Sequence, residues 1–480
     1  MRKLWLRNVY CATPRRWEQI CFFLTGLFVI SAYLRISVSP SGAQVARQTE
    51  TIGAGLRFAE EFRARGYPAL DYFLHPVALG GGASAASIHD GLPLLGVIGG
   101  FFQAGSPDPW IGVFLTSAFL LAFHLYVAYA ELPKLLAAWG AQISRPLCLP
   151  LWLSSAAIAN LTTVITPESL ALPLLVLGAA RILTGSKFRD TALGIIWLSL
   201  SIASCPALAP GIALVALAPA LRESYTKRAP SLLAACALSF VLPIWWHFIN
   251  ASGSLYPPAI NPAALAKLLT REVQFTQLPY FLGILTLLIG FYLREWCAIF
   301  LFLAALLFSA IAAGPMAALQ GAPLAGASLL AVITLARILG ATSGHRFLRP
   351  ILLAAIVWGA LFSVRTNIWI SGRASQHGKL EPWAFARAAR PDIPPGFHVI
   401  TDDAFPTTKL MLLGRSGKAA GADVYTTCSE ASYAALPLAL ISDRPPPLGQ
   451  VLCGGRPREI RHVIASGMKW YITLLPAPKG

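Results

Sequence analysis

Long apolar segments follow one another along this chain between Glu18 and Arg365. There are about eleven of them, and a helix needs roughly 20 apolar residues to cross a ~30 Å hydrocarbon core. Two of them, Trp110–Ala130 and Cys297–Ala313, contain no Asp, Glu, Lys or Arg. Only helices and closed barrels satisfy their backbone groups in a bilayer, and the alternating pattern of a barrel strand is missing. The pattern predicts an α-helical polytopic membrane protein with about 11 transmembrane helices.

Charged residues make up 12% of the chain, whereas soluble domains average ~25%. Many of the Lys and Arg residues lie in short loops between apolar segments, so the net charge of +17 reflects membrane orientation rather than nucleic-acid binding. The basic N-terminus predicts a cytoplasmic start, with Ile20–Ile36 as a first span that is not cleaved. The alternation of basic and uncharged loops then leaves the C-terminus outside, after a last span near Ile351–Val364. We expect a multi-pass protein of the inner (plasma) membrane, and the Ala-, Arg- and Gly-rich composition suggests a bacterial one.

Two outer segments are too long to be simple connections, because loops beyond ≈ 12–15 residues usually carry function or are disordered. The first, residues 37–108, contains Gln44–Arg65, where Ile52, Leu56, Ala59 and Phe62 recur at helical spacing. This spacing predicts an amphipathic helix that could lie in the headgroup plane and that stops at Gly66–Pro68. A polar pair, His89 and Asp90, then precedes a second apolar helix.

The second outer segment follows Arg365 and has a more polar composition. We predict strands at Phe397–Asp403 and Lys469–Leu475 and helices at Thr407–Arg415 and Arg458–Ser466, hence a small C-terminal α/β extracytoplasmic domain. The predicted division is a transmembrane domain at 1–364, which includes the outer loop 37–108, and the α/β domain at 365–480. Cys428 and Cys453 fit a disulfide if this domain faces an oxidising compartment, with two unrelated thiols as the alternative.

Four motifs occur in a recognisable order. They are Thr49–Glu50 after the first span, the helix and stop at Leu56–Gly66, the turn at Asp90–Leu94, and the turn at Ile165–Leu170. This order resembles the GT-C superfamily of integral-membrane glycosyltransferases, in the branch of protein mannosyltransferases and the aminoarabinose transferase for lipid A. The family has an Asp-Glu pair where this chain has Thr49 and Glu50, and a Lys in the turn that is absent here.

The resemblance implies a polyprenyl-phosphate sugar as donor and a glycan, lipid or protein as acceptor. A carboxylate must then act as general base on the acceptor, and cations must hold the phosphate that leaves. Glu50 is the first candidate for the base, with Asp90 and Asp71 as alternatives. Candidates for substrate binding are Lys267, Arg271, Arg57, Glu168 and His89. Lys267 and Arg271 stand four residues apart and would share a helical face, although they could equally be interfacial anchors.

No cofactor follows with certainty from the residues. A divalent metal held by members of the group Asp71, His75, His89, Asp90 and Glu168 stays open, although their spacing fits no zinc motif. Three other functions compete with a transferase: a transporter or flippase of lipid-linked saccharides, an O-antigen polymerase or ligase, and a non-catalytic scaffold. The carboxylates gather at one membrane face and the chain has no internal repeat, which favours surface chemistry over passage.

Overall fold

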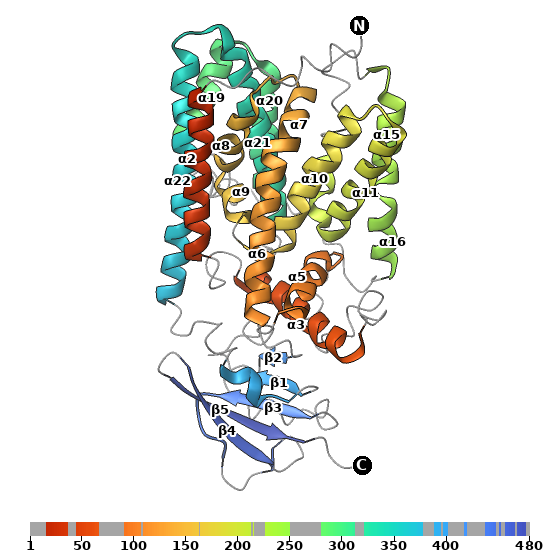
Figure 1. The fold of residues 1–480 in the computed structure, drawn as a ribbon, viewed down its shortest axis with the longest axis vertical. Helices are drawn as coiled ribbons and strands as arrows, with labels where there is room; N and C mark the ends of the chain where they lie inside the picture. Colours follow the sequence, from red (N-terminus) through yellow and green to blue (C-terminus); the bar gives the residue numbers. More distant parts are fainter. Residues whose placement is uncertain are drawn as a thin grey trace. The chain divides into compact units, whose positions relative to one another are not determined.

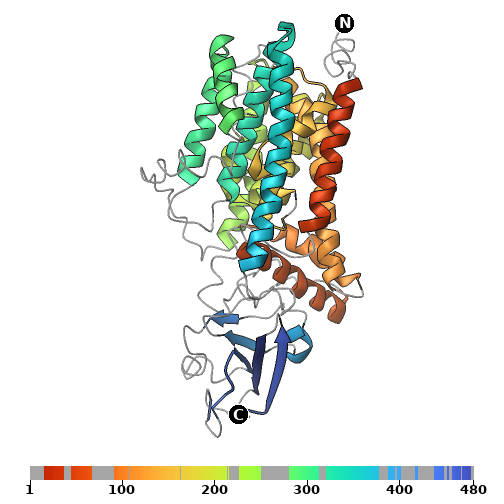
Figure 2. The same cartoon turned by 90° about the vertical axis from the view of Figure 1, so that its left-hand side faces the viewer.

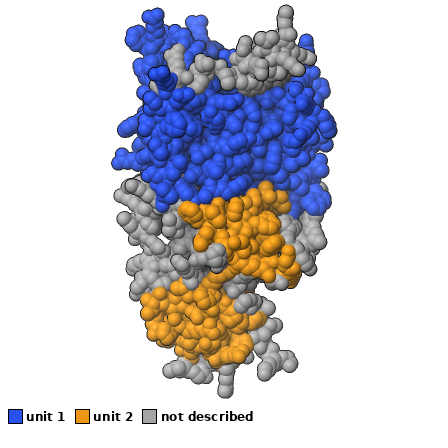
Figure 3. Space-filling model, in the orientation of Figure 1, with its two compact units in different colours: residues 1–37, 117–370 blue, residues 38–116, 371–480 orange. Residues whose placement is uncertain are grey.

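The computed structural model is mostly helical, with a β-sheet near the C-terminus (Figure 1). It describes residues 16–36, 45–66, 91–106, 109–162, 164–212, 215, 226–249, 280–312, 321–377, 388–394, 397–401, 417–419, 437–447, 451–452, 457–465 and 468–476. The chain divides into two compact units, residues 1–37 with 117–370 and residues 38–116 with 371–480 (Figure 3).

The first unit is a bundle of helices. Its elements are α2 (Arg16–Ile36), the larger part of α6 (Pro109–Tyr126), the π-helix η3 (Val127–Glu131), α7 (Leu132–Ala138), α8 (Arg145–Leu153), α9 (Ala156–Leu161), α10 (Pro167–Thr184), α11 (Phe188–Ser204), the 3₁₀ helix η4 (Pro206–Ile212), α15 (Ala229–Leu238), α16 (Val241–Ile249), α19 (Tyr280–Tyr292), α20 (Trp296–Ala312), α21 (Gly321–Ala341), the 3₁₀ helix η7 (Thr342–Gly344) and α22 (Leu348–His377).

Four helical stretches among the described residues are long and apolar enough to span a membrane: Ile111–Ala138, Pro167–Thr184, Ala229–Trp246 and Leu348–Thr366. Shorter apolar helices lie at Glu18–Leu34, Leu94–Ala104, Phe281–Tyr292 and Ser328–Gly344. The expected first span agrees with α2 and the expected last span with α22. The total of about eleven spans stays a prediction, because several predicted segments fall partly outside the described residues.

Helix α10 occupies the interior of the bundle, where 83% of its apolar window is buried. It lies against α11 at two facing glycines. A methyl group at Gly178 would come within 2.9 Å of the main-chain oxygen of Gly194, and one at Gly194 within 3.0 Å of that of Gly178. Lipid tails are as apolar as the helix surfaces, so close backbone packing of this kind is a main source of helix association in membranes.

Helix α8 ends at Leu153 and α9 begins at Ala156, so Ser154 and Ser155 form a break between the two helices. Ser155 caps α9, its hydroxyl accepting the main-chain N–H of Ile158 at 3.4 Å. The carbonyl of Ser154 accepts the hydroxyl of Ser363 on α22 at 3.0 Å. A break in a membrane helix is tolerated where side chains satisfy the freed backbone groups. Here the hydroxyls of Ser155 and Ser363 do so.

The helical part of the second unit consists of α3 (Val45–Arg65), α5 (Leu94–Ala104) and the first turns of α6. The prediction of an amphipathic helix at Gln44–Arg65 is confirmed by α3. The helix ends where expected, at Gly66, whose positive φ of 77° favours glycine. The apolar helix expected after His89 and Asp90 is α5.

A five-stranded sheet completes the second unit. Its strands are β1 (His398–Thr401), β2 (Gly417–Ala419), β3 (Leu438–Ser442), β4 (Glu459–Ala465) and β5 (Met468–Leu475), in the order β2-β1-β3-β5-β4. β1 runs parallel to β2 and β3, whereas β5 is antiparallel to β3 and β4. Figure 2 shows the sheet from the side. Every residue of β1 and β3 is buried, as expected for apolar strands covered on both faces.

One expected helix of this region is a strand. Residues Arg458–Ser466 were predicted to be helical, but β4 pairs with β5 along its whole length, from Glu459 opposite Leu474 to Ala465 opposite Met468. The β-branched Ile460, Val463 and Ile464 suit a strand, and pairing with β5 overrides the helical spacing. The strands expected near Phe397–Asp403 and Lys469–Leu475 are confirmed. The helix expected at Thr407–Arg415 lies outside the described residues.

Candidate functional site

Glu50, the predicted base, lies on α3, the first described helix after α2. Arg57 follows seven positions later, so the helical period places both on one face of α3. The opposite face is buried and carries Ile52 and Leu56, with exposed fractions of 2% and 0%. The side chains of Glu50 and Arg57 are not among those that the structure describes.

The buried face of α3 packs closely on α5. A methyl group at Gly55 would lie 3.2 Å from the main-chain oxygen of Gly96, and one at Gly100 would lie 2.5 Å from a ring carbon of Phe58. Phe58 also stacks edge-on with Phe101, with ring centroids 4.9 Å apart. The apolar face of α3 therefore has a protein partner. The sequence alone had suggested that this face could lie against the lipid headgroups.

Arg63 joins the end of α3 to the end of α5. Its guanidinium donates to the main-chain oxygens of Gln103, of Ala104 at 3.2 Å and of Ser106 at 2.9 Å. The last carbonyls of a helix have no partners within it and carry partial negative charge, so a cation there is favourable. This contact holds the helix that bears Glu50 in a defined direction relative to α5.

A separate group of polar residues lies in the first unit, at the beginning of α10. Thr166 takes an extended conformation at the N-cap, Pro167 is the first helical residue and Glu168 lies in the first turn. This is the pattern of residues that helix N-termini favour. Glu168 is fully buried, and the positive end of the helix dipole stabilises a carboxylate in this position.

A hydrogen-bonded chain ties α6 and α8 to this first turn. Trp152 Nε1 donates to His124 Nδ1 at 3.2 Å, and His124 Nε2 lies 2.7 Å from the main-chain oxygen of Ser169. An indole N–H only donates, so Nδ1 must be the acceptor and Nε2 must carry the hydrogen. His124 is therefore a neutral imidazole that bridges two helices. The hydroxyls of Thr166 and Ser169 pair at 3.1 Å beside it.

Most of the other predicted site residues lie outside the described residues. They are Asp90, His89, Lys267 and Arg271, the metal candidates Asp71 and His75, and the cysteines Cys428 and Cys453. Among the described residues no group of three or more His, Cys, Asp or Glu is placed to hold a metal ion. Of the residues predicted for substrate binding, Glu168 has a described environment.

Sequence reasoning missed His124, Glu131 and Arg63, three polar residues whose side chains make specific contacts in the structure. His124 is fully buried, and Glu131, on the π-helix, has an exposed fraction of 1%. Lys134 lies 2.9 Å and Arg181 3.9 Å from the Glu131 carboxylate. A signal existed for the first two, because ionisable residues inside an apolar segment are rare and mark functional or structural sites. No local pattern distinguished the third, Arg63, from the other arginines of α3.

The fold can be compared with solved structures. ArnT from Cupriavidus metallidurans in the apo state matches 96% of this chain and 99% of its own, with a TM-score of 0.54 and 11% identity. The chain has the ArnT fold. The structure of the same ArnT bound to undecaprenyl phosphate matches over the same shares, with a TM-score of 0.50 and 12% identity. The ArnT fold and the apolar helices indicate a membrane-embedded protein, and the fold agrees with the one that the resemblance implied.

A third match is weaker. The match to the Archaeoglobus fulgidus oligosaccharyltransferase covers 88% of this chain and 68% of the other, with a TM-score of 0.43 and 12% identity. No family model and no curated protein sequence matches the chain.

Proposed function

We propose that this protein is a membrane glycosyltransferase that moves a sugar from a polyprenyl-phosphate donor to an acceptor at the outer face of the membrane. The observation that carries the proposal is the ArnT fold, which extends over 96% of the chain. One of the two ArnT structures holds undecaprenyl phosphate, the class of lipid that the motif resemblance implies for the donor. The acceptor is a glycan, a lipid or a protein.

The chemistry needs a base and a set of cations. We assign the base to Glu50, which takes the proton of the acceptor hydroxyl or amine while that atom attacks the anomeric carbon of the sugar. The bond from that carbon to the phosphate oxygen breaks, and the polyprenyl phosphate leaves with the electron pair. Lys267, Arg271 and Arg57 are the proposed partners of the phosphate as its charge develops. Asp90 is the alternative base.

Two features of the described residues support this assignment. The helix that carries Glu50 is docked on α5 by Arg63 and by close glycine contacts, and a base acts well only when its support is rigid. The first turn of α10 is likewise held by His124 and Trp152. We propose that Glu168, buried in that turn, binds the sugar part of the donor together with His89.

The orientation is part of the proposal. The positive-inside rule puts the N-terminus in the cytoplasm and the C-terminal sheet outside, in the periplasm or extracellular space, for a protein of the inner (plasma) membrane. Glu50 follows the first span and so falls on the outer side. Cysteine labelling with a membrane-impermeant maleimide at an engineered Gly344→Cys and Gly417→Cys tests this placement, because the two sites should label from opposite sides.

The decisive experiment compares the wild type with three variants, Glu50→Gln, Glu61→Gln and Asp90→Asn. Membranes that contain one of these proteins receive a radiolabelled polyprenyl-phosphate sugar and an acceptor extract. Glu61 lies eleven residues after Glu50 and falls near the same helix face, so it is a matched control. Transfer should be lost in Glu50→Gln and kept in Glu61→Gln. Movement of the labelled lipid across vesicles without transfer would instead indicate a flippase, and loss of transfer in Asp90→Asn alone would move the base to Asp90.

A further inference from the structure

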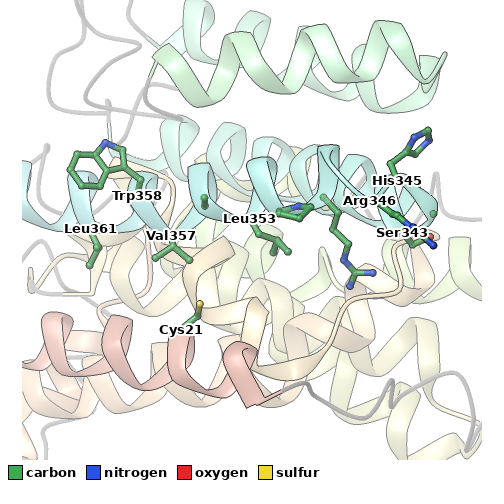
Figure 4. Close-up of a pocket in the computed structure, with 12 residues that line it drawn as sticks. Cys21, Ser343, His345, Arg346, Leu353, Val357, Trp358 and Leu361 are labelled. Carbon is green, nitrogen blue, oxygen red and sulfur yellow. The ribbon is translucent and has the colours of Figure 1, made fainter.

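A groove of about 770 Å³ lies between α2 and α22 in the first unit (Figure 4). The N-terminal ends of α2 and α22 lie at the same end of the helix bundle, at the top in Figures 1 and 2. The groove has two kinds of lining. One end is polar and basic, with Ser343, His345, Arg346 and Arg349, and the remainder is apolar, with Leu353, Val357, Trp358 and Leu361.

The two kinds of lining are separated along the helix axis. From Leu353 to Leu361 the helix advances eight residues, or about 12 Å at 1.5 Å per residue. Half of a ~30 Å hydrocarbon core is about 15 Å. The apolar part of the groove is therefore about as long as the acyl chain of one leaflet, and the basic part lies where a headgroup would be.

The charges at the basic end do not cancel. Arg349 lies 3.9 Å from the carboxylate of Glu18, which is 3% exposed. Arg346 is exposed, and within the described part of the chain no ion pair of Arg346 occurs. One arginine charge is thus left over at this end of the groove. A guanidinium binds a phosphate oxygen strongly because its donors are fixed in one plane.

We propose that this groove is a binding site for a phospholipid with a net negative headgroup, such as phosphatidylglycerol. Arg346 binds the phosphate, Arg349 contributes while it keeps its contact with Glu18, and one acyl chain lies along Leu353, Val357 and Leu361. Basic pockets between membrane helices recognise anionic lipids in this way. The bound lipid joins α2 to α22 by filling the space beside their ion pair.

The test uses the full chain purified in detergent, with native mass spectrometry and thermal unfolding as readouts. The added probes are dioleoyl phosphatidylglycerol, dioleoyl phosphatidylcholine, undecaprenyl phosphate and glycerol 1-phosphate. Phosphatidylglycerol should bind and raise the unfolding temperature, whereas phosphatidylcholine and glycerol 1-phosphate should do neither. Arg346→Gln should weaken phosphatidylglycerol binding about tenfold or more, since a charge-assisted hydrogen bond is lost. Arg189→Gln, an exposed arginine at the start of α11, should leave binding unchanged.

A second pair of variants fills space rather than removing charge. Ala354 lines the groove and is exposed, so Ala354→Trp should abolish binding of the lipid. Ala234→Trp puts the same ring on the exposed side of α15 and should not. Equal binding of both phospholipids in all variants would overturn the proposal. So would binding of undecaprenyl phosphate alone, because the groove would then belong to the path of the donor.

Discussion

His124 Nε2 lies 2.7 Å from the main-chain oxygen of Ser169, so an imidazole on α6 holds the first turn of α10. Trp152 donates to the other ring nitrogen and selects the tautomer. Three helices thus meet at one neutral side chain in the interior of the bundle. The same turn contains Glu168, so the contact lies one residue away from a buried carboxyl group.

Replacing His124 tests how much these hydrogen bonds stabilise the bundle. In His124→Phe the Trp152 N–H and the Ser169 carbonyl both lose a buried partner, which should lower the free energy of unfolding by about 1–2 kcal/mol. Size-exclusion chromatography after heating in detergent measures the shift. Trp152→Phe removes one hydrogen bond of the pair and should cost less. Equal stability of His124→Phe and the wild type would show that the hydrogen bonds contribute nothing.

Replacing Glu168 separates binding from folding. Glu168→Gln keeps the shape of the side chain, so the fold should persist, while the KM for the donor should rise about tenfold through a lost charge-assisted contact. Initial transfer rates at varied donor concentration measure it. If kcat falls and KM is constant, Glu168 acts in the reaction step; if thermal stability falls in parallel with activity, its role is structural.

The contact between α3 and α5 has no room for added atoms. A methyl group at Gly100 would lie 2.5–2.8 Å from three carbons of Phe58, so Gly100→Ala should destabilise the protein by about 1–3 kcal/mol and should reduce transfer. Gly105→Ala is the control, because its methyl group would make an ordinary contact of 3.5 Å. Adding Phe58→Leu to Gly100→Ala should restore part of the stability, as measured by thermal unfolding.

Glu131 should contribute more to stability than Asp190, a less buried acid that also lies near Arg181. Its carboxylate is buried against Lys134 and Arg181, whose side chains are 31% and 34% exposed. Breaking a fully buried pair costs roughly 3–5 kcal/mol, and the exposure of both cations reduces this to about 1–3 kcal/mol for Glu131→Gln. Asp190, 4.0 Å from Arg181 and about one-third exposed, is the comparison: Asp190→Asn should cost less than about 1 kcal/mol. Similar losses in both variants would contradict the assignment.

A carboxyl group of the C-terminal sheet should titrate late on acidification. Arg461 donates to both oxygens of Glu459, at 2.8 and 2.9 Å, and this hydrogen bonding lowers the pKa of Glu459. A lowered pKa means that the pair stabilises the fold above the unfolded value of about 4.3 and loses this effect as the pH falls through the folded value. Carbon-13 chemical shifts of labelled Glu459 should give that lower midpoint. Arg461→Gln should return it to the ordinary value, and no change would contradict the pairing.

The predictions that succeeded from sequence rest on local rules. Helix α3 and its end at Gly66 follow from apolar spacing and a glycine stop. The strand at Lys469–Leu475 follows from its β-branched and aromatic residues. The failed prediction, β4, had a helical spacing of its own, but its backbone is paired along its whole length with β5. Pairing with β5 therefore made this segment a strand, which its own residues did not predict.

The sequence by itself determined that this is a helical membrane protein, the order of its motifs and the position of the amphipathic helix, because hydropathy and helical period are properties of consecutive residues. The tertiary structure alone decided that α5 covers the buried face of α3, that Arg63 binds the end of α5, and that His124, Trp152 and Ser169 meet. These contacts join residues 28 to 45 positions apart. They depend on how close two helices come, which is set by glycines and ring sizes on both partners and not by either segment alone.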